Sequence, residues 1–340
     1  MTEPERNIRL VCAPMATLSH EAFRRCIERC GQSARMPSAC DEHFTEMINA
    51  ASLLNQGPYE RYYIQSGPVP HRTVWQITGS KPESLARAAQ MLSQYGGMGV
   101  DINMGCSAPQ IYRTGAGISW MLRPLREAED AVRGVRKALD DAERQTGMHL
   151  RLSVKCRLGA EDFTEAGLFS FTDMLTANGV ELITLHPRTI KEKYRGLPKY
   201  VWAERLAARY AGQGTAVYVN GDVCDARSLS RVMEACPHSA GIMIARAAAA
   251  KPWIFAELKG AHARLDAERI ALDFIDDVEN FQPKDFHRTR LQRFFSYYSQ
   301  NFSFAHYFRT QMLGATDTAQ SRERLMDYFK RQPDDREIEF

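Results

Sequence analysis

The 340-residue chain has no apolar run near the roughly 20 residues that a membrane-spanning helix needs. Its first residues, MTEPERNIRL, lack the apolar core of a secretory signal peptide. No G-x-G-x-x-G follows the first apolar run, so a dinucleotide-binding Rossmann half is not indicated. We find no solenoid repeat and no low-complexity tract. These absences predict a globular protein of the cytoplasm that does not associate with membranes.

Cysteine is present eight times, and in a cytoplasmic protein these residues should be reduced thiols. Cys26 and Cys30 lie four residues apart, with Cys40 ten further on, a spacing that matches no common metal motif. Two interpretations of these cysteines are open: a metal or cluster site, or ordinary buried or surface thiols. The spacing favours thiols, and no metal is expected.

Short apolar runs alternate with helical stretches as far as residue 258. Such alternation over about 250 residues is typical of a (β/α)8 barrel, with a doubly wound sheet as the rival. The candidate strands are 8–15, 72–79, 99–105, 150–156, 181–186, 216–221 and 240–245, with a weaker one near 34–39. The helices expected between them are 20–30, 82–95, 125–143, 164–178, 201–211, 226–234 and 252–262.

The alternation stops around 263–284, and helical spacing without strand signals follows. We therefore expect an α/β fold: a (β/α)8 TIM barrel over residues 1–260, then a small all-helical domain over 261–340 with a loose acidic tail. Between Phe281 and Arg331, nine Lys/Arg and four Asp/Glu are interleaved with aromatic residues. Such a mixture suits a nucleic-acid surface, although composition alone favours a helical bundle with an aromatic core.

Polar or reactive side chains stand at the ends of most candidate strands. In DINMGCSAPQIYRTGAG (101–117), Asn103 and Cys106 follow directly on an apolar run. Barrel enzymes keep their chemistry at this edge, and a thiol there can donate or accept a proton, or attack a substrate. The other groups at strand ends are Pro14, Met15, Ala16, Gln76, Lys155, Arg157, His186, Arg188, Asn220, Gly221, Asp222, Ala245 and Arg246.

Several of these groups suit a planar cofactor that carries a phosphate. Gly221 and Ala245 are small enough for backbone N–H groups to approach a phosphate, and Arg246 adds a charge. Lys155 can stabilise negative charge on a reduced flavin, and Gln76 can hydrogen-bond a ring edge. Each residue alone has an ordinary structural explanation, but together they point to an FMN site.

The chain resembles the tRNA-dihydrouridine synthases, FMN-dependent (β/α)8 enzymes with a C-terminal helical domain. The matching segments, in family order, are CAPMA (12–16), TEMINA (45–50), WQITGS (75–80), DINMGC (101–106), GAG (115–117), VKCRLG (154–159), LHPRT (185–189), NGDV (220–223) and IMIARAA…PWIF (242–255). The resemblance implies that Cys106 is the catalytic acid and that Asn103, Arg157 and Arg188 bind substrate. It implies that FMN is bound by Pro14, Met15, Ala16, Gln76, Lys155, His186, Asn220, Gly221, Asp222, Ala245 and Arg246.

The implied reaction is reduction of the C5–C6 double bond of uridine in tRNA to dihydrouridine. Hydride from reduced FMN adds at C6, and Cys106 gives a proton to C5. A thiol suits that role because its reference pKa, about 8.5, keeps it mostly protonated at neutral pH. NADPH re-reduces the FMN. Because the target base must leave its stack, residues 261–340 become the expected RNA-binding module. The partner is tRNA, and no stable protein partner is implied.

The chain departs from the family pattern at several positions. Ser107 follows Cys106 where proline is usual, and Thr17, Pro187 and Ala245 stand where glycine is usual. A lysine common after the Cys-Pro is missing from SAPQIYR. The extra methyl at Ala245 predicts weaker FMN binding, and Pro187 stiffens its loop. Two alternatives stay open: an FMN-dependent barrel reductase acting on another RNA or on a small enone or pyrimidine, and a non-catalytic RNA-binding relative.

Overall fold

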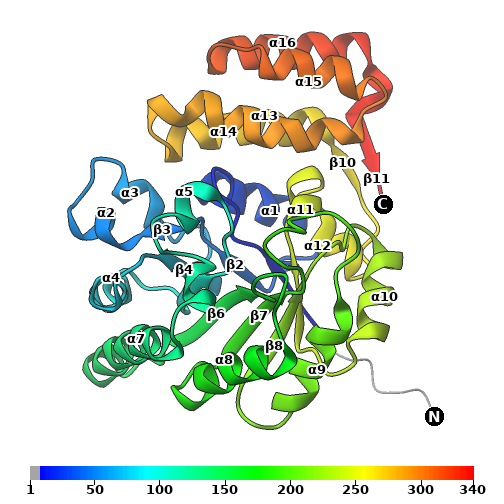
Figure 1. Ribbon diagram of the computed structural model, residues 1–340. Helices are drawn as coiled ribbons and strands as arrows, with labels where there is room; N and C mark the ends of the chain where they lie inside the picture. Colours follow the sequence, from blue (N-terminus) through cyan, green and yellow to red (C-terminus); the bar gives the residue numbers. More distant parts are fainter. Residues whose placement is uncertain (1–7) are drawn as a thin grey trace.

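Eight parallel strands close into a barrel in the computed structural model, which describes residues 8–340 (Figure 1). The order around the ring is β1–β2–β4–β5–β6–β7–β8–β9, and β9 pairs with β1 to close it. The (β/α)8 barrel is thus confirmed. The strands are β1 (Arg9–Cys12), β2 (Glu42–Phe44), β4 (Thr73–Thr78), β5 (Gly99–Met104), β6 (Arg151–Arg157), β7 (Leu182–His186), β8 (Ala216–Asn220) and β9 (Gly241–Ile244), and β3 (Ile48–Asn49) lies alongside β4.

The strand expected near 34–39 is wrong. Those residues end α1 and turn, and the strand lies later, at β2. Its polar sequence hides it from a search for apolar runs. The Glu42 carboxylate accepts hydrogen bonds from Arg151 at 2.6 Å and Arg9 at 2.8 Å, and His43 contacts Glu28 at 2.7 Å. Two of the three residues of this strand are thus buried through polar contacts, and only Phe44 is buried as an apolar side chain.

Helices wrap the outside of the barrel because each offers an apolar face to the strands. The longest, α7 (Leu125–Thr146), buries Val132, Val135 and Leu139 completely. The remaining helices of the barrel are α1 (Glu21–Ser33), α2 (Ala50–Leu54), α3 (Glu60–Tyr63), α4 (Pro82–Leu92), α5 (Pro109–Tyr112), α6 (Ser119–Leu122), α8 (Glu165–Ala177), α9 (Tyr200–Tyr210), α10 (Ala226–Ala235), α11 (Arg246–Ala250) and α12 (Ile254–Leu258). The expected order of strands and helices is therefore largely correct.

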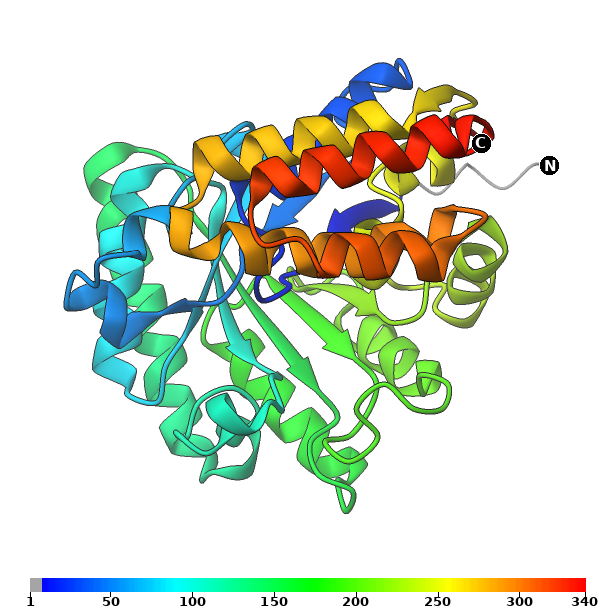
Figure 2. The ribbon, with the colours of Figure 1, turned by 90° about the horizontal axis from the view of Figure 1, so that it is seen from above.

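Four helices form a layer beside the barrel: α13 (Ala267–Phe281), α14 (Lys284–Tyr298), α15 (Ala305–Leu313) and α16 (Thr318–Arg331). Helix α13 packs on α1, and α14 packs on α11. Seen from above, the layer covers one side of the barrel and leaves β6, β7 and β8 in view (Figure 2). The aromatic rings Phe294, Tyr298, Phe302 and Phe308 are buried in this layer.

The loose tail expected at the C-terminus is wrong. Glu337–Glu339 forms β11, which pairs antiparallel with β10 (Arg264–Asp266). Phe340 and Ala263 exchange two backbone hydrogen bonds, at 3.0 and 3.2 Å. Ile338 and Phe340 alternate with glutamates and pack against the core, which is the two-residue period of a strand.

Within residues 8–340, no helix combines the length and the apolar content that a membrane span requires. The first seven residues of MTEPERNIRL, on which the signal-peptide expectation rests, lie outside the described residues.

Candidate active site

The reactive groups expected at the strand ends converge at the carboxyl edge of β5, β6 and β7. Asn103 lies beside Lys155 in the register of β5 and β6, and Arg157 lies beside His186 in that of β6 and β7. Parallel strands all end at the same rim of a barrel, so these side chains share one face. Arg188, two residues beyond β7, adds another cation there.

Cys106 sits on a loop that its own backbone contacts hold in place. The Asn103 side-chain oxygen accepts the Cys106 N–H at 2.9 Å and the Gly105 N–H at 3.3 Å. The Cys106 carbonyl accepts the Ile118 N–H at 3.0 Å. Gly117 has a φ of 61° and lies so close behind Cys106 that a Cβ would collide with its carbonyl oxygen. The thiol is half-buried, which leaves it both ordered and accessible.

A buried chain of hydrogen bonds leads from β6 to the Cys106 loop. The Asp101 carboxylate accepts from Ser153 and from the Gln76 amide, each at 2.7 Å. The Gln76 carbonyl then accepts from the Asn103 amide at 2.9 Å. A carboxylate can only accept, so Asp101 fixes the orientation of both amides. Burial raises the pKa of Asp101 to about 6, while its partners Gln76 and Ser153 oppose that rise.

Lys155 points to the opposite side of the ring. Its ammonium donates to the Asn220 side-chain oxygen at 2.8 Å, and the Asn220 amide donates to the Met243 carbonyl at 2.8 Å. Burial and the neighbouring Arg157 lower the pKa of Lys155 to about 8, although Asp101 raises it. The group is therefore still a cation at neutral pH, but one that lacks an ion-pair partner at hydrogen-bonding distance among residues 8–340.

Asp222 joins two of the predicted cations. It pairs with Arg188, which is 1% exposed, and with Arg246 at 2.8 Å. Asp222 has a φ of 51°, in the left-handed region. The preceding Gly221 leaves room for Pro198, whose Cγ would lie 2.9 Å from a Cβ at that position. The Asp222 carboxylate thus holds Arg188 and Arg246 in place. A phosphate bound by these arginines would lie beside the Asp222 carboxylate.

His186 is a neutral imidazole. Burial lowers its pKa strongly, and Lys155 and Arg157 lower it further. Its Nε2 lies 3.2 Å from the Arg188 guanidinium, which can only donate, so Nε2 is the acceptor. The other ring nitrogen then carries the proton and can donate to a ligand.

Pro14, Met15 and Ala16, which follow β1 after the buried Ala13, lie on a partly exposed turn. Ser19 accepts the Met15 N–H at 2.8 Å and donates to the Ala13 carbonyl at 2.8 Å. Pro14 and Met15 are half-buried, and Ala16 is exposed at the rim. Ala245 begins α11 beside them, since Ala13 N–H bonds the Ile244 carbonyl at 2.9 Å.

Tyr194 was missed in the sequence analysis. Its ring is 63% exposed and lies 6.0 Å from the His186 ring. The guanidinium carbons of Arg246 and Arg157 lie 5.1 and 5.6 Å from its centre. The available signal was an aromatic residue between two basic ones, Lys193 and Arg195, in the loop after His186.

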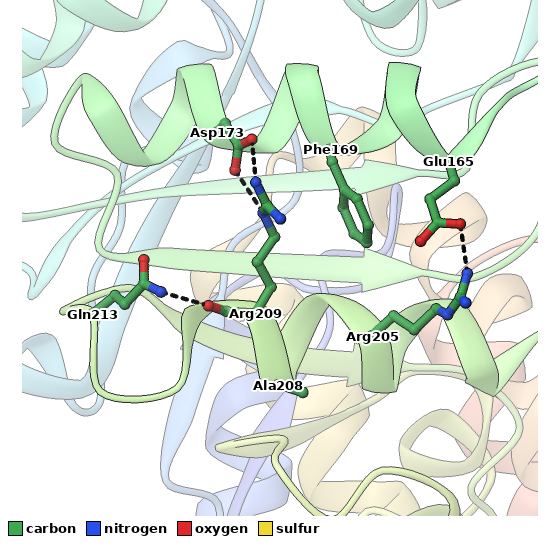
Figure 3. A pocket seen from close by; sticks show the side chains of 7 residues that line it. All are labelled: Glu165, Phe169, Asp173, Arg205, Ala208, Arg209 and Gln213. Atoms are coloured by element: carbon green, nitrogen blue, oxygen red, sulfur yellow. Dashed lines mark hydrogen bonds and ion pairs between the residues drawn. The ribbon is translucent and has the colours of Figure 1, made fainter.

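A cavity of about 590 Å³ lies elsewhere, on the outer wall between α8 and α9 (Figure 3). Two ion pairs span it, Arg205–Glu165 and Arg209–Asp173, each at 2.7 Å, with Phe169 between them. These paired groups are satisfied by each other, and none of the predicted reactive side chains lines this cavity. The candidate active site is therefore the barrel rim, where the predicted side chains converge.

The comparisons with known proteins identify the family. Residues 11–339 match the family model described as Dihydrouridine synthase (Dus). The chain belongs to the dihydrouridine synthase family. It is 32% identical over 252 residues to a probable tRNA-dihydrouridine synthase of Aquifex aeolicus, covering 74% of this chain and 72% of that protein. It is 27% identical over 271 residues to tRNA-dihydrouridine synthase B of Pseudomonas putida, covering 79% and 73%.

Other similar proteins are matched over less than half of their own length or share only the fold. The human protein named tRNA-dihydrouridine(47) synthase NAD(P)(+)-like is 28% identical over 274 residues, which is 80% of this chain and 39% of that protein. A structure of morphinone reductase in complex with tetrahydroNAD has 12% identity and a TM-score of 0.47, covering 74% of this chain and 86% of that one. Family membership makes this dihydrouridine synthase a flavin-dependent oxidoreductase.

Proposed function

We propose that this chain reduces the C5–C6 double bond of uridine in tRNA, with FMN as its flavin and NADPH as the reductant. The observation that carries the proposal is the placement of a half-buried thiol, Cys106, on the same rim as Lys155, Arg157 and Arg188, in a member of the dihydrouridine synthase family. The balance is one uridine, one NADPH and one proton giving one dihydrouridine and one NADP⁺.

The residues present fit a flavin. The Thr78 and Thr184 hydroxyls are buried on barrel strands and have no hydrogen-bond partner among residues 8–340. Lys155 supplies a cation without a competing carboxylate in contact. The proposal assigns the phosphate to Asn220, Gly221, Asp222, Ala245 and Arg246, and the rest of the flavin to Pro14, Met15, Ala16, Gln76, Lys155 and His186. Gln76 is fully buried and bonded to Asp101 and Asn103, so it would act from beneath the rim.

FMN, when bound and reduced, supplies the hydride for C6 of the uracil. Cys106 gives the proton that C5 needs, and its Asn103-anchored loop holds the thiol in place. Arg157 is a donor suited to the uracil carbonyl oxygens, on which negative charge grows as C6 accepts hydride. Arg188 is buried and paired with Asp222, so it would act from behind the rim through its charge. Lys155, still charged at neutral pH, stabilises negative charge at the flavin.

The helical layer, with residues 261–340 as its extent, is the part that we propose binds RNA. Most of its aromatic rings form its core, as composition suggested, but Phe304 and Tyr307 are 54% and 41% exposed. Arg331 on α16 is exposed and interacts electrostatically with Tyr307, and Arg309 is exposed on the same helix as Tyr307. Exposed rings beside a cation suit unstacked bases and phosphates. Tyr194 at the barrel rim offers a further ring surface for the extruded base.

The test is anaerobic and uses the full chain with its flavin. The protein is reduced with NADPH and mixed with tRNA that lacks dihydrouridine, and the visible absorbance of the flavin is followed. We expect rapid reoxidation that requires the tRNA, together with dihydrouridine in the product. Cys106→Ala should still be reduced by NADPH yet form little dihydrouridine, whereas Cys224→Ala, a change of an exposed cysteine, should match the wild type.

Each other outcome would count against a stated part of the proposal. A flavoprotein that NADPH reduces but tRNA does not reoxidise would exclude tRNA and favour another RNA or a small enone or pyrimidine. A protein that binds no FMN would refute the enzymatic proposal and favour a non-catalytic RNA-binding relative. Dihydrouridine formation at an unchanged rate by Cys106→Ala would exclude Cys106 as the acid.

A further inference from the structure

The helical layer reaches the rim of the barrel through a buried ion pair. Arg290 on α14 donates to the Glu46 carboxylate at 2.9 Å, and the two side chains are only 2% and 5% exposed. The rings of Phe286 and Tyr63 lie 5.3 and 5.7 Å from the guanidinium carbon and enclose it. Glu46 lies just past β2, so a residue of the helical layer supplies the counter-charge for a carboxylate of the barrel.

Glu46 in turn faces the turn after β1. Burial raises the pKa of Glu46, while Arg290, the backbone N–H of Thr17 and Arg24 act to lower it. The carboxylate therefore lies between a cation of the helical layer and the tip of the turn that carries Pro14, Met15 and Ala16. Losing either neighbour would leave a buried charge poorly compensated.

The tip of this turn holds a strained residue, Thr17, within a turn closed by the Leu18 N–H, which donates to the Met15 carbonyl at 3.1 Å. Thr17 has a φ of 64°, in the left-handed region, which strains a residue other than glycine. The base of the turn is fixed, since Ser19 bonds Met15 and Ala13 and its own carbonyl accepts from Arg24 at 3.0 Å. The Thr17 hydroxyl bonds only the neighbouring Ala16 carbonyl, at 2.6 Å, which does not tie the tip to the barrel.

We propose that Arg290 is a positioning residue for the flavin: by pairing with Glu46 it holds the Thr17 turn in the shape in which Pro14, Met15 and Ala16 contact FMN. The inference rests on the proposed FMN site. A glycine, the usual residue of the resembled family at position 17, would adopt this turn without strain. With threonine there, this chain makes the cofactor site depend on the helical layer.

The experiment measures FMN binding to the full chain by quenching of flavin fluorescence. Arg290→Met keeps the length of the side chain and removes the charge. We expect FMN binding about tenfold weaker, equivalent to about 1.4 kcal/mol. Arg288→Met, an exposed position on the same helix, should bind FMN as the wild type does. Unchanged FMN affinity in a folded Arg290→Met protein would overturn the proposal.

A second substitution separates positioning from simple support of the fold. In the Arg290→Met background, Thr17→Gly should restore most of the lost FMN affinity, because glycine needs no hold at this φ. A general folding defect would persist whatever stands at position 17. Failure of Thr17→Gly to recover FMN binding would therefore overturn the inference while leaving the FMN site itself intact.

A matched pair of changes guards against misfolding. If Arg290→Met does not fold because Glu46 is left alone, Glu46→Met combined with Arg290→Met removes both charges. The same loss of FMN affinity and the same recovery with Thr17→Gly are expected in that protein. If the wild-type chain binds no FMN, the proposed function is refuted. If wild type and variant bind FMN equally well, only the inference about Arg290 is refuted.

Discussion

Replacing Lys155 by methionine should make the flavin-free protein more stable while impairing its reaction. Burial lowers the pKa of Lys155 from 10.5 to about 8, with Arg157 adding to the effect. That difference corresponds to a cost of about 3 kcal/mol for holding the ammonium in the folded state at pH 7. Methionine has a similar length and carries no charge, so it avoids this cost.

The net gain in the free energy of unfolding is smaller than 3 kcal/mol because the variant also loses the hydrogen bond to Asn220. The ammonium donates to Asn220 at 2.8 Å, and losing this hydrogen bond costs about 1 kcal/mol. The variant should thus be about 2 kcal/mol more stable at pH 7. For 340 residues the entropy of unfolding is about 0.7 kcal/mol per kelvin, so Tm should rise by about 3 °C.

The sign of the pH dependence provides a further check. A lysine with a lowered folded-state pKa destabilises fully below about pH 8, and the cost fades as pH rises towards 10.5. The variant should therefore be more stable than the wild type by about 2 kcal/mol near pH 7, and this advantage should disappear and reverse slightly by pH 10.5, where only the lost hydrogen bond remains. Calorimetry of both proteins at pH 7, 9 and 10.5 measures this.

The control is Lys137→Met, because that lysine is 76% exposed and pairs with Asp141 on the surface of α7. It should leave Tm nearly unchanged. A Tm of Lys155→Met below that of the wild type at pH 7 would refute the argument that burial destabilises this cation. Conversely, added FMN should stabilise the wild type more than Lys155→Met, and the variant should form dihydrouridine more slowly.

Three more outcomes follow from the site. Because burial raises the pKa of Asp101 to about 6, the free energy of unfolding of the wild type should fall by up to about 3 kcal/mol as the pH rises from 4 through 6. Urea unfolding of Asp101→Asn should not show this fall. Burial and nearby cations keep His186 neutral, so its NMR signals should not titrate between pH 5 and 8. A transition in that range would contradict a neutral ring whose Nε2 accepts from Arg188. Combined alanine substitutions at Phe304 and Tyr307 should raise KM for tRNA while FMN affinity stays constant; an unchanged KM would exclude this surface.

The order of the strands and the residues at their ends were predictable because both are local patterns. One apolar run is followed by Asn103 and Cys106, and another ends near Lys155. In each case a few neighbouring residues are enough to predict both the strand and the reactive group at its end. Since all parallel strands of a barrel end at one face, their convergence needed no further information. The strand β2 was not predicted because Glu42 is buried through ion pairs with arginines from other strands, and such pairs leave no apolar pattern in the local sequence.

The sequence by itself determined the barrel, its rim of reactive groups and the family, because alternation and short motifs depend on neighbours along the chain. Tertiary structure alone decided which of those groups neutralise one another. Asp222 pairs with both Arg188 and Arg246, and Tyr194 stands over His186. The pair between Arg290 and Glu46 joins positions 244 residues apart, a contact that exists only once α14 has packed against the barrel. Charge pairing and burial depend on distances in space, and those are set when the whole chain has folded.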